Sequence, residues 1–146
     1  MSRPPPRPRE AYPRFAPITT RWGDNDAFGH VNNGVYYAWF DTAVNRFLIE
    51  GGFLDVVGSR VIGVVAENGC RFFSELAYPD AVAVGMRVAA LGRSSVRYEL
   101  GVFREGAADA SAEGHFVHVY VDRGSMRPVA IPDDLRAALT GLQQPD

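Results

Sequence analysis

The sequence predicts an α+β fold in which one long helix packs against an antiparallel sheet. Residues 33–50 carry apolar side chains at helical spacing, and after residue 60 the apolar pattern changes to a period of two. Short turns separate the period-two segments, which favours antiparallel pairing. At 146 residues the chain has the length of one domain with a core of its own.

Residues 1–16 differ in composition from the rest of the chain. Prolines and arginines alternate there, and proline removes backbone donors and fixes φ. We therefore expect a disordered tail over 1–16 and one domain over 17–146. No apolar stretch follows the arginines, so the segment lacks the pattern of a secretory signal. The tail carries a formal charge of +3, which leaves the predicted domain acidic within a net charge of −2.

The predicted domain begins with a short strand at 18–22 and a polar segment at 23–32. The helix expected at 33–50 is apolar around much of its circumference, which indicates burial on several sides. Its large apolar residues are Val35, Tyr36, Tyr37, Trp39, Phe40, Val44, Phe47 and Leu48. The two glycines that follow at 51–52 provide a C-terminal stop.

Four further strands are expected at 61–73, 82–88, 96–102 and 115–121, and then a short helix at 132–142. Glu67, Asn68 and Gly69 interrupt the first of these strands. They indicate either a contribution to an active site or a β-bulge with solvated side chains, and the sequence leaves both interpretations open.

Composition excludes several classes of function. A net charge near zero argues against a general nucleic-acid binder. All 15 basic residues are arginine, so Schiff-base chemistry is absent. The single cysteine, Cys70, excludes an internal disulfide and fits a reducing, cytoplasmic location. We expect no cofactor, no metal and no membrane association, because no ligand cluster has recognisable spacing and no apolar run reaches about 18 residues.

The polar segment before the long helix carries the candidate chemistry. Asp24, Asp26 and His30 lie there, followed by Asn32 and Asn33 at the expected helix start. One of the two asparagines is expected to cap the helix. The first backbone N–H groups of a helix can stabilise an oxyanion, and a nearby carboxylate can attack a carbonyl carbon or activate water. These are the parts required for attack on an acyl group.

Residues 26–33 read Asp-Ala-Phe-Gly-His-Val-Asn-Asn and are followed by Tyr36 and Tyr37. This segment resembles the hotdog-fold acyl-CoA thioesterases of the 4-hydroxybenzoyl-CoA thioesterase type. Weaker similarities follow at Phe72, 78–80 and 127–132, so that the resemblance covers roughly 15–140. It implies a long central helix wrapped by a five-stranded antiparallel sheet.

The resemblance also implies roles for the residues of this segment. Asp26 is the nucleophile or the general base on water, and the backbone amide of Asn33 polarises the thioester carbonyl. His30 orients Asp26 or the substrate. Asn32 and Gly34 adjoin this site and are expected to contact the substrate. Tyr36, Tyr37 and Trp39 are candidates for the wall of the acyl pocket, with core packing the stronger interpretation for at least one of them.

The resemblance further implies an acyl-CoA substrate and a homodimer or homotetramer with the active site at the subunit interface. Two alternatives remain open, a thioesterase acting on an acyl-carrier protein and a non-catalytic acyl-binding protein. A hotdog hydratase is disfavoured, because its aspartate precedes its histidine by five positions and Asp26 precedes His30 by four. Candidate ligands for CoA phosphates, among which the sequence does not select, are Arg71, Arg93, Arg97, Arg123 and Arg127.

Overall fold

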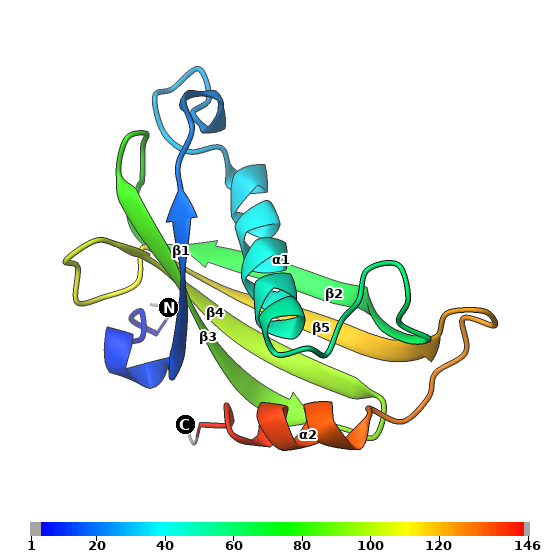
Figure 1. Ribbon diagram of the computed structural model, residues 1–146. Helices are drawn as coiled ribbons and strands as arrows, with labels where there is room; N and C mark the ends of the chain where they lie inside the picture. Colours follow the sequence, from blue (N-terminus) through cyan, green and yellow to red (C-terminus); the bar gives the residue numbers. More distant parts are fainter. Residues whose placement is uncertain (1–3, 145–146) are drawn as a thin grey trace.

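The computed structural model describes residues 4–144 and contains one antiparallel sheet with a long helix across one face (Figure 1). The strand order is β1-β3-β4-β5-β2. The predicted architecture of one long helix and five strands is confirmed. The elements are β1 (Arg14–Thr19), α1 (Asn33–Glu50), β2 (Val61–Phe72), β3 (Ala81–Leu91), β4 (Ser95–Arg104), β5 (Ala112–Asp122) and α2 (Asp133–Thr140).

Helix α1 has the bounds that the sequence predicts. It begins after Asn32, whose side chain accepts a hydrogen bond from the Gly34 N–H at 2.9 Å, and it ends at the glycine pair, where Gly52 has a φ of +77°. The expectation of burial on several sides is wrong for one side of the helix. Ile49 is half exposed there, because the single sheet covers only the opposite side of α1.

The core lies between α1 and the helix-facing side chains of the three central strands. Phe40 is completely buried and rests on Gly114 of β5, where any Cβ would overlap the ring. The same core cluster contains Val84 of β3, Tyr98 of β4 and Phe116 of β5. The close approach at Gly114 fixes the height of α1 above the sheet, and so the position of its N-terminus.

The first strand begins earlier than predicted. Strand β1 starts at Arg14 and pairs with β3 from Arg14↔Met86 to Thr19↔Ala81. Pro17 is tolerated within it because β1 is an edge strand. Trp22, the expected last strand residue, lies instead in a 3-10 turn and is largely exposed.

The expected tail is also wrong for much of its length. Tyr12 is buried on the sheet face opposite α1, where Gly85 and Gly101 leave room for its ring. The Arg9 N–H donates to the Ala108 carbonyl at 3.0 Å. This proline-rich segment therefore packs on the sheet despite its composition. The buried Tyr12 ring provides the apolar contact area that a disordered segment would not have. Residues 1–3 of the expected tail lie outside the described residues.

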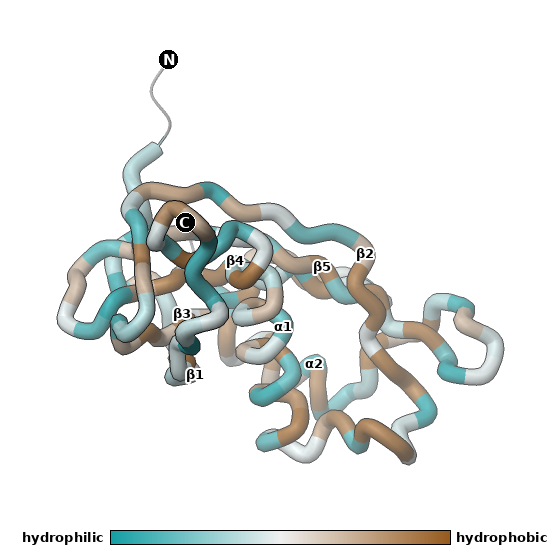
Figure 2. The backbone as a smooth tube through the Cα atoms, turned by 90° about the horizontal axis from the view of Figure 1, so that it is seen from above, coloured by the Kyte–Doolittle hydropathy of each residue, from teal (hydrophilic) through white to brown (hydrophobic). Residues whose placement is uncertain are grey.

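Strand β2 contains the irregularity that the sequence marks. The register with β5 shifts between Val65 and Glu67, so a β-bulge interrupts the ladder. Figure 2 shows that β2 turns from hydrophobic to hydrophilic in its middle, at the edge of the sheet. The bulge interpretation of this segment is confirmed.

The burial of His118 predicts that acid destabilises the fold. Its imidazole is buried on the α1 side of the sheet, with ring centroids 4.9 Å from Phe116 and 6.0 Å from both Tyr98 and Tyr120. Burial lowers the pKa of His118 from 6.5 to about 4. The unfolded chain therefore binds this proton more readily between these two values, and stability falls as the pH drops through that window.

We expect this histidine to cost about 3 kcal/mol of folding free energy when the pH falls from 7 to 4. Urea unfolding at pH 7 and pH 4 measures the loss. The matched variant is His118→Phe, which keeps an aromatic ring and removes the titration. An equal pH dependence in both proteins would show that His118 is not the cause.

Candidate active site

A buried carboxylate anchors the segment before α1. Asp24 is almost completely buried, and its Oδ2 accepts the Arg21 backbone N–H at 2.7 Å while its Oδ1 accepts the Arg21 guanidinium at 2.9 Å. The Asp24 carbonyl accepts the Asn32 N–H at 2.9 Å. Asp24 thus joins the segment after β1 to the start of α1.

A tight turn presents Asp26 next to that anchor. The Asp26 N–H donates to the His30 carbonyl at 2.9 Å, and the Asp26 Oδ1 accepts the Phe28 N–H at 2.8 Å. Gly29 closes the turn with a φ of +86°, which a side chain would strain. Among the described residues, the Asp26 Oδ2 has no hydrogen-bond donor. This oxygen is available to a substrate or to water.

The helix start supplies a free donor beside Asp26. Asn33 is the first residue of α1, and the cap of Asn32 satisfies Gly34 while its carbonyl accepts the Val35 N–H at 3.0 Å. Over residues 4–144, the backbone N–H of Asn33 donates to no acceptor. The N-terminal end of the helix dipole therefore adds to an unpaired N–H group at this point.

These two groups line one open cavity of about 460 Å³. Four of the predicted site residues, Asp26, His30, Asn33 and Tyr36, line it together. The complete lining is Asp26, Phe28, His30, Val31, Asn33, Tyr36, Phe72, Phe73, Ser74, Glu75 and Leu76.

Three predicted substrate-binding residues do not line this cavity. Asn32 uses its side chain as the helix cap, and Gly34 donates to it. Tyr37 packs edge-on against Phe40, with ring centroids 6.2 Å apart. The helical turn explains the outcome for the tyrosines, since adjacent residues lie about 100° apart around the helix and only Tyr36 faces the cavity. Trp39 is buried in the core.

Tyr36 forms the floor between the cavity and the core. Its ring lies 5.2 Å from Trp39 and 5.0 Å from Phe72, centroid to centroid. Burial raises the pKa of Tyr36 to about 12, so the hydroxyl remains protonated at neutral pH and can donate a hydrogen bond.

Sequence reasoning missed the opposite wall, which comes from the connection between β2 and β3. Glu75 in this connection pairs with His30, with Nε2 and Oε2 2.9 Å apart. The Val31 N–H donates to the Leu76 carbonyl at 2.8 Å and holds the two segments side by side. Phe72 is part of the resemblance, but only the folded sheet brings its strand end next to the turn of Asp26.

Among the described residues, Cys70, His115 and His118 form neither a nucleophilic site nor a metal site. Cys70 is half buried, and burial raises the pKa of its thiol to about 12, so it is a poor nucleophile. His115 and His118 lie on opposite faces of β5, as their alternation predicts. The described residues contain no group of three or more His, Cys, Asp or Glu side chains arranged for a metal ion. Within the same part of the chain, no helix is long and apolar enough to cross a membrane.

Several solved structures are similar to this chain over most of its length. The PA5185 protein from Pseudomonas aeruginosa strain PAO1 is 57% identical, covers 97% of this chain and 98% of its own, and superimposes with a TM-score of 0.93. A thioesterase from Thermus thermophilus, solved with coenzyme A and zinc, is 31% identical, with coverage of 93% and 99% and a TM-score of 0.76.

A gentisyl-coenzyme A thioesterase, BH1999, is 26% identical, with coverage of 84% and 99% and a TM-score of 0.75. No curated protein matches the chain. The family model of the thioesterase-like superfamily matches residues 20–139, which contain the helix, four of the strands in full and the whole cavity lining. The chain therefore belongs to the thioesterase-like superfamily and has the hotdog fold of its thioesterases.

Proposed function

We propose that this protein hydrolyses an acyl-CoA thioester to a free acid and CoA. The observation that carries the proposal is the shared cavity of the Asp26 carboxylate and the Asn33 N–H at the start of α1. Two relatives named for CoA, one solved with it and one a CoA thioesterase, support this choice of substrate class.

The reaction requires a donor for the carbonyl oxygen and a base or nucleophile for the carbonyl carbon. The Asn33 N–H receives the developing oxyanion. The Asp26 Oδ2 either attacks the carbon, which forms an anhydride and expels the thiolate, or removes a proton from an attacking water. Both routes consume one water: it attacks the thioester carbon while Asp26 passes its proton to the leaving thiolate, or it hydrolyses the anhydride, which releases the acid and regenerates the Asp26 carboxylate. The thiolate is a good leaving group, which explains why a carboxylate and one oxyanion donor suffice.

The wall of the cavity suits an acyl group with apolar surface. Phe28, Phe72 and Phe73 lie around the reacting groups, with Tyr36 as the floor. The protonated Tyr36 hydroxyl gives this wall one polar donor. The pair of His30 and Glu75 holds the two sides of the cavity together, and we assign it the positioning of the Asp26 turn.

The two other functions remain alternatives. A carrier-protein thioesterase would need to attract an acidic partner, and the acidic domain opposes this. A non-catalytic acyl-binding protein has no need for a carboxylate with an unengaged oxygen in the pocket. The unengaged carboxylate oxygen favours hydrolysis over binding alone, and the choice of CoA rests on the two relatives named for it.

We also propose that the active unit is a homodimer, or a tetramer built from two such dimers, with the cavity at the interface. Strand β2 is a sheet edge, and Phe72 at its end is part of the cavity wall and is 37% exposed. Pairing of β2 with a second copy would cover this edge. Light scattering on the eluted protein tests the assembly, and a monomer at assay concentration would contradict it.

A thiol-release assay over short, long and aromatic acyl-CoAs tests the function. We expect turnover of at least one class with equal amounts of thiol and acid formed. Failure of the wild type to release thiol from any of them, at micromolar enzyme, would overturn the proposal.

A further inference from the structure

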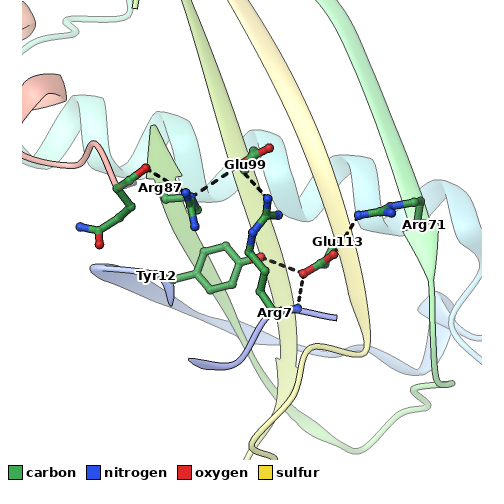
Figure 3. Close-up of polar contacts among 7 residues, drawn as sticks. Arg7, Tyr12, Arg71, Arg87, Glu99 and Glu113 are labelled. Carbon is green, nitrogen blue, oxygen red and sulfur yellow. Dashed lines mark hydrogen bonds and ion pairs between the residues drawn. The ribbon is translucent and has the colours of Figure 1, made fainter. Parts of the chain in front are cut away.

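A second hollow, of about 310 Å³, lies on the sheet face opposite α1. Figure 3 shows four of its charged side chains, Arg7, Arg71, Glu99 and Glu113, on the face of the sheet opposite α1. Its lining is Arg7, Cys70, Arg71, Arg97, Glu99, Glu113, Gly114 and His115. None of these residues lines the cavity that contains Asp26.

The acids of this hollow lie deep and are already neutralised. Glu113 is 4% exposed and accepts hydrogen bonds from the Arg7 backbone N–H, the Tyr12 hydroxyl and the Arg71 guanidinium, the last at 3.0 Å. Glu99 lies between Arg7 and Arg87, at 3.4 Å from each. Neither carboxylate presents an unpaired charge to the solvent.

The cations of the hollow lie above these acids. The Arg71 and Arg97 side chains are 46% and 39% exposed, and His115 stands beside them. His115 has room to lie over β2 because residue 69 is glycine, where a Cβ would come within 2.5 Å of the ring. The surface that solvent meets is therefore cationic, although the domain as a whole is acidic.

One exposed acid, Glu67, partly balances these cations. Its Oε2 lies 3.6 Å from the Arg97 guanidinium and 3.5 Å from the His115 Nε2. Both distances exceed those of a good charge-assisted hydrogen bond. Such loose pairs between exposed groups contribute little, so a stronger anion can replace Glu67 at low cost.

The hollow and the active-site cavity come close to each other at the end of β2. The Arg71 guanidinium lies 5.7 Å from the centroid of the Phe73 ring, and Phe73 lines the active-site cavity. From Phe73 to Glu67 the strand covers about 20 Å at roughly 3.3 Å per residue. This is the order of length that separates a bound thioester from the phosphates at the far end of an extended pantetheine arm.

We propose that Arg71 and Arg97, with His115, bind the phosphates of the CoA portion of the substrate. The proposal rests on the proposed acyl-CoA hydrolysis and selects two of the five arginines that the sequence leaves open. Guanidinium groups recognise phosphate oxygens through paired N–H donors, and both arginines line the one hollow in which a phosphate would sit.

Arg97 is the better test position, because Arg71 also neutralises buried Glu113. We expect Arg97→Gln to raise the KM for acyl-CoA about tenfold, as for loss of one charge-assisted contact. The ratio of KM for acyl-pantetheine, which has no phosphate, to KM for acyl-CoA should shrink by the same factor. Arg127→Gln, at an exposed arginine of the predicted candidate set, is the matched control and should leave this ratio unchanged.

Glu67→Gln should act in the opposite direction, because it removes the anion that competes with phosphate. We expect it to lower the KM for acyl-CoA and to widen the same ratio. Opposite effects of Arg97→Gln and Glu67→Gln distinguish phosphate binding from a general structural role. Acyl-phosphopantetheine identifies which phosphate is bound. If the two variants change its KM as they change that of acyl-CoA, the site binds the phosphate next to the pantetheine arm. If its KM does not change, the site binds the phosphates of the nucleotide.

Titration calorimetry of CoA and of pantetheine keeps this test independent of turnover. Weaker binding of CoA by Arg97→Gln, with unchanged binding of pantetheine, supports the phosphate site. This holds even if the wild type hydrolyses no thioester, a result that would overturn only the proposed function. Equal CoA affinity in the wild type and Arg97→Gln, or an equal loss with pantetheine, would overturn the phosphate site.

Discussion

Replacing Asp26 by asparagine is expected to lower kcat for thioester hydrolysis by about 10²–10⁴-fold, the range typical of losing a catalytic base or nucleophile. The carboxamide that replaces the carboxylate keeps an oxygen for the Phe28 N–H, so the turn is retained. It lacks the negative charge and the nucleophilic second oxygen. Thiol release at saturating acyl-CoA measures the effect.

The control for this variant is Asp41→Asn, the same change at an exposed position of α1 outside the cavity. Its kcat should match the wild type. Thermal unfolding should show that Asp26→Asn is folded, because Asp26 has no ion pair within residues 4–144 to lose. Wild-type kcat in Asp26→Asn would remove this carboxylate from the mechanism.

Replacing Asn33 by proline is expected to lower kcat by about 10²–10³-fold, the usual loss for one oxyanion donor. Asn33 is the first helical residue, where proline is well tolerated because that N–H has no intrahelical partner. The preceding Asn32 has a φ of −61° and a ψ of 139°, an extended conformation that a following proline allows. The variant thus removes the donor and keeps the helix.

Asn33→Ala separates the backbone from the side chain. It retains the N–H and removes only the carboxamide, so its kcat should stay within a few-fold of the wild type. If Asn33→Ala loses as much activity as Asn33→Pro, then the side chain and not the amide is the functional group.

The sequence predicted those parts of the fold that depend on local patterning. The bounds of α1 follow from a cap at Asn32 and a glycine stop, and the alternation in β5 puts Phe116, His118 and Tyr120 on one face, which in the fold is the face toward the helix. Local patterning misassigned the segment before Pro17, because its order depends on a distant surface. Tyr12 packs where two glycines of other strands leave space for its ring. The sequence of the tail itself carries no sign of that space.

The same distinction applies to the site. The local motif placed Asp26, His30 and Asn33 together, because a single turn and a helix start hold them. The opposite wall and the Glu75 partner of His30 come from a connection far along the chain, and depend on the pairing of Val31 with Leu76. Adjacent tyrosines at 36 and 37 could be told apart only once the helix was oriented on the sheet.

The most direct test of a shared role for Asp26 and the Asn33 amide is the kcat of the double variant Asp26→Asn/Asn33→Pro, compared with both single variants on one acyl-CoA. Groups that act as one catalytic unit give losses that do not multiply, whereas independent contributions to one transition state do. We predict that the two groups act as a unit, so that the double variant is only slightly slower than the slower single variant. Losses that multiply in full would show two independent contributions and would contradict this unit.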